Sequence, residues 1–288
     1  MLYVFLSIFC SVMVSVLFKL AKRYHIDVLQ AITWNFAAAI ILIWIIYRPE
    51  LSSQTLSLIP IYPYVTLGVL MPVLFLIIAA SIRINGIVLT VIVERLSLFI
   101  PLVITFIIYQ ALDNVKIIGV ALSFAAILCL IPWKRTTKRT AGGWIYLIGA
   151  FIGMGFVLTL FRRATILGIP NITSFYILFI IAFIVSLVLL LIQVSRKKTR
   201  FSWPHILIGG IMGLAFLGYV TFNLQIHQAM ATQPRAAFSA LNVGIITLAM
   251  MVGLFIFNER LTKLNKVGIF LALVAIIVVA NTDLVNAF

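Results

Sequence analysis

The chain has 288 residues, of which 64% are hydrophobic and only 9% are charged. A soluble globular domain has about 25% charged residues, so this composition indicates an integral membrane protein. Ten helices of about 20 residues would use about 200 residues and leave only short connections. We therefore exclude a separate soluble domain, nucleic-acid binding and a secreted disulfide scaffold. Any function must be carried by side chains within the helices or at their ends.

Hydropathy divides the chain into ten apolar segments bounded by Pro, charged or turn-forming residues. The first segment has no basic leader and no small-residue cleavage pattern after it, so we expect a retained span. The predicted fold is all-α and integral to the membrane, with ten transmembrane helices over residues 2–20, 28–47, 61–82, 86–109, 115–132, 143–161, 170–194, 205–225, 236–257 and 267–280.

The net charge of +15 is explained by topology, because Lys and Arg accumulate in cytoplasmic loops. Fifteen of the 21 Lys and Arg residues lie in loops after odd-numbered segments, five lie on the opposite side, and Arg95 lies within a segment. The count predicts that both termini face away from the cytoplasm.

The chain divides near Arg139 into two halves of five helices, residues 1–139 and 140–288. An odd number of spans in each half requires the second half to insert upside down. Gly119 and Gly268 take matching places at the start of the last helix of each half. Inverted repeats are typical of secondary transporters, whose substrate site lies near the membrane midplane where the repeats meet.

The run Phe257-Asn258-Glu259-Arg260-Leu261 precedes the last helix, and Pro101 lies in the fourth. With ten short spans in two halves, the chain resembles the EamA-type branch of the drug/metabolite transporter superfamily over its whole length. It departs from the pattern at residues 110–113, where Gln-Ala-Leu-Asp stands in place of a Glu-Arg-Leu turn.

This resemblance implies a secondary transporter of small metabolites, often an exporter, in a bacterial inner membrane. Helices one to four and six to nine would surround a central cavity, and helices five and ten would be peripheral. Family members commonly keep their termini in the cytoplasm, which conflicts with the charge count, and we follow the count.

Glu94 is the one acidic residue well inside a predicted span, about 12 Å from its start. A charge there costs at least about 2.5–3.5 kcal/mol on insertion scales, which favours a functional role. Thr90 and Ser97 share its helix face, so we expect this face to line a cavity and Glu94 to bind a proton or a cationic group. The alternative is a structural ion pair with a neighbouring helix.

Arg95 points about 100° away from Glu94 and has apolar neighbours on its own helix. It must therefore reach another helix, a substrate anion or water. The first helix carries a polar seam of Ser7, Ser11, Ser15 and Lys19, which favours close helix packing over cavity lining. We interpret Lys19, at the rim of the membrane, as a snorkelling cytoplasmic anchor.

Polar side chains in the second and eighth helices suit a zwitterionic or heteroaromatic solute, with packing or interfacial anchoring as the alternative. They are Gln30, Trp34 and Asn35 in the second helix and Tyr219, Asn223 and His227 on one face of the eighth. For His227 we favour an interfacial residue over a proton relay. Arg235, Ser239 and Asn242 share one face of the ninth helix, and Arg235 is either an interface residue or attracts an anionic group. Asn242 matches the position of Glu94 in the other half to within about one residue. Glycine pairs at 149/153 and 209/213 predict close helix contacts.

We expect a non-enzymatic secondary active transporter of small polar metabolites, such as amino-acid or nucleobase-like solutes. It would export by alternating access with proton coupling, without cofactor or metal. No protease or hydrolase motif is present in the sequence, and the three His residues do not cluster. Two alternatives remain: an importer or exchanger of anionic solutes, and a non-transporting membrane scaffold or lipid scramblase.

Overall fold

A computed structural model of the chain describes residues 2–49, 61–109, 114–131, 142–165, 171–197, 201–229 and 234–280. Over these ranges the regular structure is helical, and nine helices are long and apolar enough to cross a membrane. A shorter apolar helix covers Ile117–Leu130. The prediction of a helical chain consistent with a multi-pass membrane protein is confirmed.

The helix bounds lie within about one helical turn of the predicted ones, except in the fourth segment. The helices in chain order are α1 (Leu2–Arg23), α2 (Val28–Tyr47), α4 (Ile61–Asn85), α5 (Ile87–Leu96), α6 (Phe99–Tyr109), α7 (Asn114–Leu130), α8 (Gly143–Thr165), α9 (Asn171–Ser195), α10 (Trp203–Ala229), α11 (Pro234–Met251), the π-helical turn η2 (Val252–Ile256) and α12 (Lys263–Ala280).

Local sequence explains several of these ends. The Asp27 carboxylate accepts hydrogen bonds from the backbone N–H groups of Leu29 and Gln30, at 2.9 and 3.3 Å, and so starts α2. Pro234 occupies the first position of α11, where a missing N–H group costs nothing.

The fourth predicted span is present as Ile87–Ile104, but it is not one continuous helix, because the chain turns at residues 97–98 between α5 and α6. Pro101 has no N–H group and cannot donate to the carbonyl of Ser97. Ile100 N donates to that carbonyl instead, at 3.0 Å, and Leu98 N donates to the carbonyl of Arg95, at 3.3 Å. Tight bonds of this kind end the α-helical pattern in the middle of the span.

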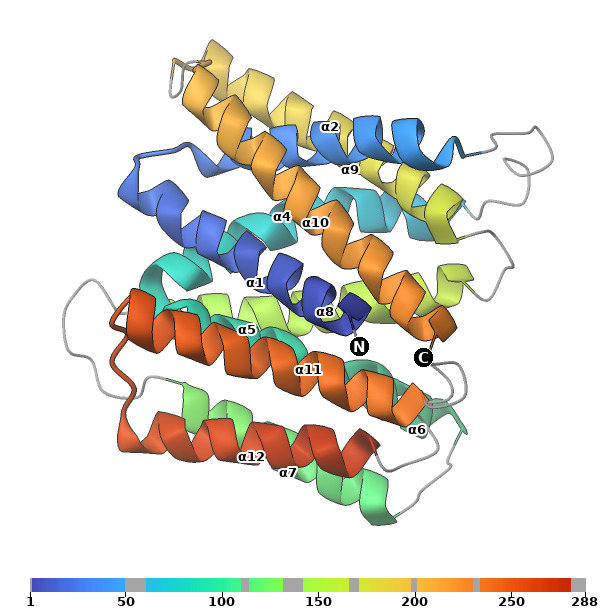
Figure 1. The fold of residues 1–288 in the computed structure, drawn as a ribbon, viewed down its shortest axis with the longest axis vertical. Coiled ribbons are helices and arrows are strands. Elements are labelled where there is room, and N and C mark those ends of the chain that lie inside the picture. Colours follow the sequence, from blue (N-terminus) through green and yellow to red (C-terminus); the bar gives the residue numbers. More distant parts are fainter. Residues whose placement is uncertain are drawn as a thin grey trace.

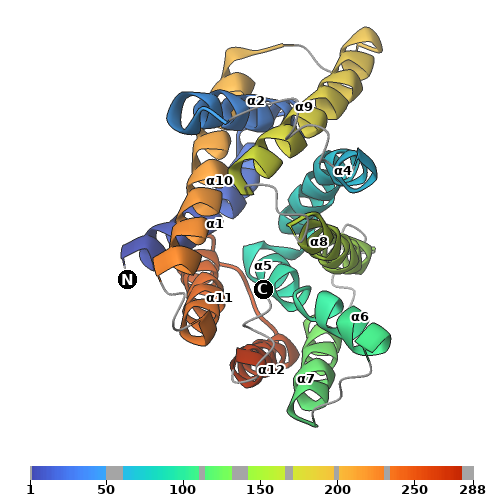
Figure 2. The ribbon, with the colours of Figure 1, turned by 90° about the vertical axis from the view of Figure 1, so that its right-hand side faces the viewer.

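The helices form one bundle, with α2, α9 and α10 towards one edge and the α7–α12 pair at the other (Figures 1 and 2). This agrees with the expected peripheral place of the fifth and tenth helices. Between the edges, α5 packs against α1, α4, α8 and α11. Every residue of α5 except Glu94 is buried.

Phenylalanine rings from five helices fill the region between α1, α2, α4, α9 and α10. Phe75 of α4 contacts the rings of Phe18, Phe36 and Phe216, with centroid distances of 6.0, 5.6 and 5.3 Å. Phe179 of α9 contacts Phe36 and Phe216 at 6.0 and 5.4 Å. We call these five residues the phenylalanine cluster.

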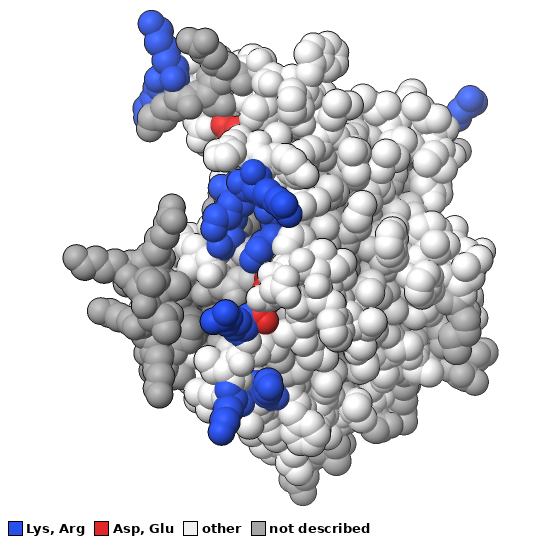
Figure 3. Space-filling view, turned by 60° about the vertical axis from the view of Figure 1, so that its left-hand side comes forward, with Lys and Arg blue, Asp and Glu red and all other residues white. Residues whose placement is uncertain are grey.

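Basic side chains gather at one end of the bundle, where α1, α4 and α9 end and α12 begins (Figure 3). Exposed members of this basic end are Lys22, Arg23, Arg196, Lys197, Arg260, Lys263 and Lys266. The arrangement agrees with the uneven distribution of Lys and Arg in the sequence.

Candidate functional site

The polar centre of the bundle is the last turn of α5. Arg95 is only 8% exposed, yet its side chain reaches two other helices. Its Nη1 donates to the hydroxyl of Tyr219 on α10 at 3.2 Å, and its Nη2 donates to the hydroxyl of Ser11 on α1 at 3.2 Å. The guanidinium carbon also lies 5.7 Å from the centre of the Tyr219 ring, within the range of a cation–π contact.

Both hydrogen-bond partners of Arg95 are neutral hydroxyl groups. Its Nε is buried and has no hydrogen-bond partner, and no carboxylate of the described residues lies within ion-pair distance of the guanidinium. Hydroxyl groups orient a guanidinium but carry no negative charge. A buried cation of this kind is stabilised when an anionic group binds next to it.

Glu94 precedes Arg95 but forms no ion pair with it or with any other described residue. Its Oε1 is buried and has no hydrogen-bond partner, although the side chain as a whole is partly exposed. The structural ion pair that was one alternative for Glu94 is thus not found among the described side chains.

The other two members of the predicted Glu94 face have partners within the protein. Thr90 is fully buried, donates to the carbonyl of Gly86 at 2.8 Å and lies 2.8 Å from the hydroxyl of Ser81 on α4. The Ser97 hydroxyl is also fully buried and donates to the carbonyl of Glu94. Both side chains stabilise α5 and its end in this structure.

Two of the candidates of α2, Trp34 and Asn35, lie where α2 packs against α10. Trp34 packs where Gly209 brings the α10 backbone close, and its buried Nε1 has no hydrogen-bond partner. Asn35 is 2% exposed with an unpartnered Oδ1, and Gln30 is fully buried. The expected close contacts of the glycine pairs are confirmed: Gly209 and Gly213 face α2, and Gly149 and Gly153 face α4.

On α11, Asn242 is 2% exposed and donates to the carbonyl of Phe238 at 2.9 Å, which leaves its Oδ1 without a partner. Ser239 is half-buried on the same helix, and Asn223 is half-buried on α10, one turn beyond Tyr219. The side chains of Arg235 and His227 lie outside the described part of the chain, as do residues 110–113.

Two parts of the site were missed from the sequence. Ser11 was placed in a packing seam, but its hydroxyl holds Arg95. Lys19 was expected only as a snorkelling anchor at the rim, but its ammonium group also forms an ion pair with Glu259, Nζ to Oε1 3.0 Å. The scarcity of acidic residues, six in the whole chain, was the signal that could have drawn attention to Glu259.

No protein-family model matches the chain. It is 31% identical over 291 residues to a protein of Haemophilus influenzae described as "Uncharacterized protein", and the alignment covers 98% of each chain. The chain belongs to the family of this Haemophilus protein. The match runs along almost the entire length of both proteins.

Proposed function

We propose that the protein is a secondary active transporter of small polar solutes that works by alternating access. The observation that carries this proposal is the unpaired Arg95, buried between α1, α5 and α10 next to an equally unpaired Glu94. A scaffold gains nothing from two costly charges at this depth, whereas a carrier uses such groups to bind its solute and coupling ion.

Helix contacts support two inverted halves, 1–139 and 140–288. In that scheme α1, α2 and α4 correspond to α8, α9 and α10, and α7 corresponds to α12. The α1–α10 and α2–α10 contacts then have counterparts in the α8–α4 and α9–α4 contacts. Gly119, the sixth residue of α7, faces Val279 near the end of α12, while Gly268, the sixth residue of α12, faces Cys129 near the end of α7.

The charges indicate the chemistry of the solute. Arg95 fits a carboxylate or a similar anionic group, with the Tyr219 hydroxyl and ring beside it. The Glu94 carboxylate can bind a proton or pair with an ammonium group. A zwitterionic solute such as an amino acid satisfies both residues, and export coupled to a proton at Glu94 is the mode we favour, as in the transporters that the sequence resembles.

The test is the thermal stability of the detergent-purified protein at two pH values, with amino acids, nucleobases, nucleosides, organic cations and phosphorylated metabolites. A solute that binds the folded state raises the melting temperature by mass action. We expect one class of solute to raise the melting temperature saturably, and we expect this rise to be lost in Arg95→Gln. The control variant Ser186→Ala should keep the rise, because it removes a buried hydroxyl of α9 that donates to the carbonyl of Phe183 on the same helix. Absence of any hit would favour the scaffold or scramblase alternative.

Arg95 also favours a second candidate, an importer or exchanger of purely anionic solutes. The Glu94→Gln variant distinguishes the two candidate functions, because it should change the affinity for the solute in opposite directions. Binding of an amino acid should weaken when the carboxylate that faces its ammonium group is removed. Binding of an anion without an ammonium group should strengthen, because a like charge beside the site is removed.

A further inference from the structure

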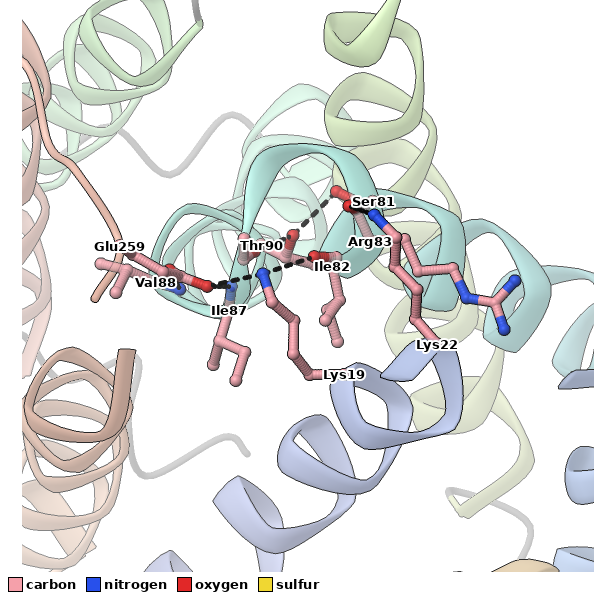
Figure 4. Close-up of polar contacts among 10 residues, drawn as sticks. Lys19, Lys22, Ser81, Ile82, Arg83, Ile87, Val88, Thr90 and Glu259 are labelled. Atoms are coloured by element: carbon pink, nitrogen blue, oxygen red, sulfur yellow. Dashed lines mark hydrogen bonds and ion pairs between the residues drawn. The ribbon is translucent and has the colours of Figure 1, made fainter. Parts of the chain in front are cut away.

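Glu259 lies in the loop between η2 and α12 and reaches the start of α5, in the other half of the chain (Figure 4). Its Oε1 accepts a hydrogen bond from Ile87 N at 2.7 Å, and its Oε2 accepts one from Val88 N at 3.1 Å. One carboxylate thus binds the first two N–H groups of α5.

The start of α5 requires such an acceptor. The residue before the helix is Gly86, which has no side chain to cap it. The first N–H groups of a helix have no partner within the helix, and they favour a negative charge. Glu259 provides both the acceptors and the charge from a distant part of the sequence.

Two glycines make room for the carboxylate. A Cβ atom at Gly86 would lie 2.6 Å from the Glu259 Cδ, and one at Gly253 would collide with Val88 Cγ2 and lie 3.1 Å from Glu259 Oε2. Asn258 adopts a positive φ of 49°, and Glu259 N donates to the carbonyl of Gly253 at 2.9 Å. The loop is therefore shaped to deliver this one side chain.

Lys19 joins α1 to the same contact. Its Nζ lies 3.0 Å from Glu259 Oε1 and donates to the carbonyl of Ile82 at 3.3 Å, at the end of α4 (Figure 4). The Lys19 and Glu259 side chains are 22% and 10% exposed, so water reaches the pair only in part. The ion pair therefore connects three segments: α1, the α4–α5 junction and the loop after η2.

The Lys19–Glu259 contact lies at the basic end of the bundle, and the candidate site lies further inside the bundle. Lys19 and Ser11 are eight residues apart on α1, and Ile87 and Arg95 are eight residues apart on α5, about 12 Å in each helix. The same two helices are therefore joined twice: at the end of the bundle by Lys19 and Glu259, and two turns deeper by Ser11 and Arg95.

We propose that Lys19 and Glu259 form a latch that closes the basic end of the bundle and must open before the Arg95 site communicates with that side of the membrane. The latch rests on the proposed function, since alternating access has to separate segments of the two halves. Opening leaves two N–H groups and an ammonium group to be solvated, so the latch resists opening until water enters.

The test measures access to a thiol between the latch and the site. In a chain carrying Cys10→Ala and Cys129→Ala, Ser15→Cys places a single thiol one turn inside Lys19, at a position that is 6% exposed. Its labelling by a membrane-impermeant thiol reagent is followed in vesicles of each orientation. Glu259→Gln should raise the rate from the basic end roughly tenfold or more, because a charged hydrogen-bond network is lost.

Lys19→Gln serves as an independent second variant, because it removes the ion pair and leaves the α5 cap in place. It should raise the rate less than Glu259→Gln does. Lys22→Gln is the matched control: this exposed lysine lies three residues further on and donates to the carbonyl of Arg83, outside the latch. It should leave the rate unchanged. Unchanged labelling in both Glu259→Gln and Lys19→Gln would overturn the latch.

A thiol at the fully buried Ser7 separates the latch from the proposed function. Alternating access predicts that Glu259→Gln lowers labelling of Ser7→Cys from the opposite side while labelling of Ser15→Cys rises from the basic end. If labelling of Ser15→Cys rises and labelling of Ser7→Cys does not fall, the latch is supported but alternating access is contradicted. If neither rate changes, the latch is wrong, and the solute experiment still decides the proposed function.

Discussion

Ser11 of α1 and Arg95 of α5 are joined by a hydrogen bond of 3.2 Å. The contact fixes the guanidinium without neutralising it, and the Tyr219 hydroxyl holds the other nitrogen. In the proposed transporter, Arg95 would therefore be positioned before any solute arrives. Such preorganisation lowers the entropic cost of binding.

Tyr219→Phe should weaken solute binding roughly tenfold, because one hydrogen bond to a charged group is lost while the ring stays in place. The measurement is the solute concentration that gives half of the maximal rise in melting temperature. The melting temperature without solute should change little. A large fall there would mean that Tyr219 acts mainly in folding.

Glu94→Gln should remove the difference in solute-dependent stabilisation between two pH values if Glu94 carries the coupling proton. The amide keeps the size of the carboxyl group and cannot titrate in this range. Purified wild-type and variant proteins are compared at both pH values with the same solute. An unchanged pH dependence would exclude Glu94 as the proton site.

Gly86→Ala should destabilise the protein by on the order of 1–3 kcal/mol, since the methyl group would displace the Glu259 carboxylate and Gly86 has a φ of 98°. Gly142→Ala is a matched control, with a φ of 95° and its nearest neighbour at 4.0 Å. Gly142→Ala introduces the same backbone strain as Gly86→Ala, but its methyl group collides with no side chain. Equal losses of melting temperature in the two variants would argue against a specific role of the Glu259 contact.

Gly209→Ala should also destabilise the protein, by about 1–3 kcal/mol, because its Cβ would lie 2.5 Å from Trp34 Cβ and 2.7 Å from the carbonyl oxygen of Ala31. The adjacent Gly210 has nothing within 4 Å, so Gly210→Ala should be neutral or stabilising by up to about 1 kcal/mol. Thermal unfolding in detergent compares the two. A greater loss of stability in Gly210→Ala than in Gly209→Ala would contradict the α2–α10 packing described above.

The charge distribution predicts the orientation of the chain. A C-terminal reporter that is active only in the cytoplasm should remain silent, whereas a reporter in the loop after α9, at the basic end, should be active. Strong activity of the C-terminal fusion would reverse the topology and place the latch on the outer side of the membrane.

The sequence predicted the helices well because lipid allows an apolar segment few alternatives to a helix. It also indicated that Arg95 must leave its own helix, since its neighbours there are apolar. It could not predict the break at Ser97, because a proline within a transmembrane helix is often accommodated without a break. The Lys19–Glu259 pair was equally hidden: the two residues are 240 positions apart, and helical periodicity relates only near neighbours.

The phenylalanine cluster differs from the polar contacts in what it permits. The rings around Phe75 meet it in tilted or edge-to-face arrangements, which have no fixed partner atoms, so Phe75 can exchange one neighbouring ring for another without leaving a polar group unsatisfied. In the proposed alternating access, this apolar contact would allow α1, α2, α4, α9 and α10 to shift against one another. The resistance to such a shift would then lie in a few polar contacts, so single substitutions at those contacts would change the rate of the motion.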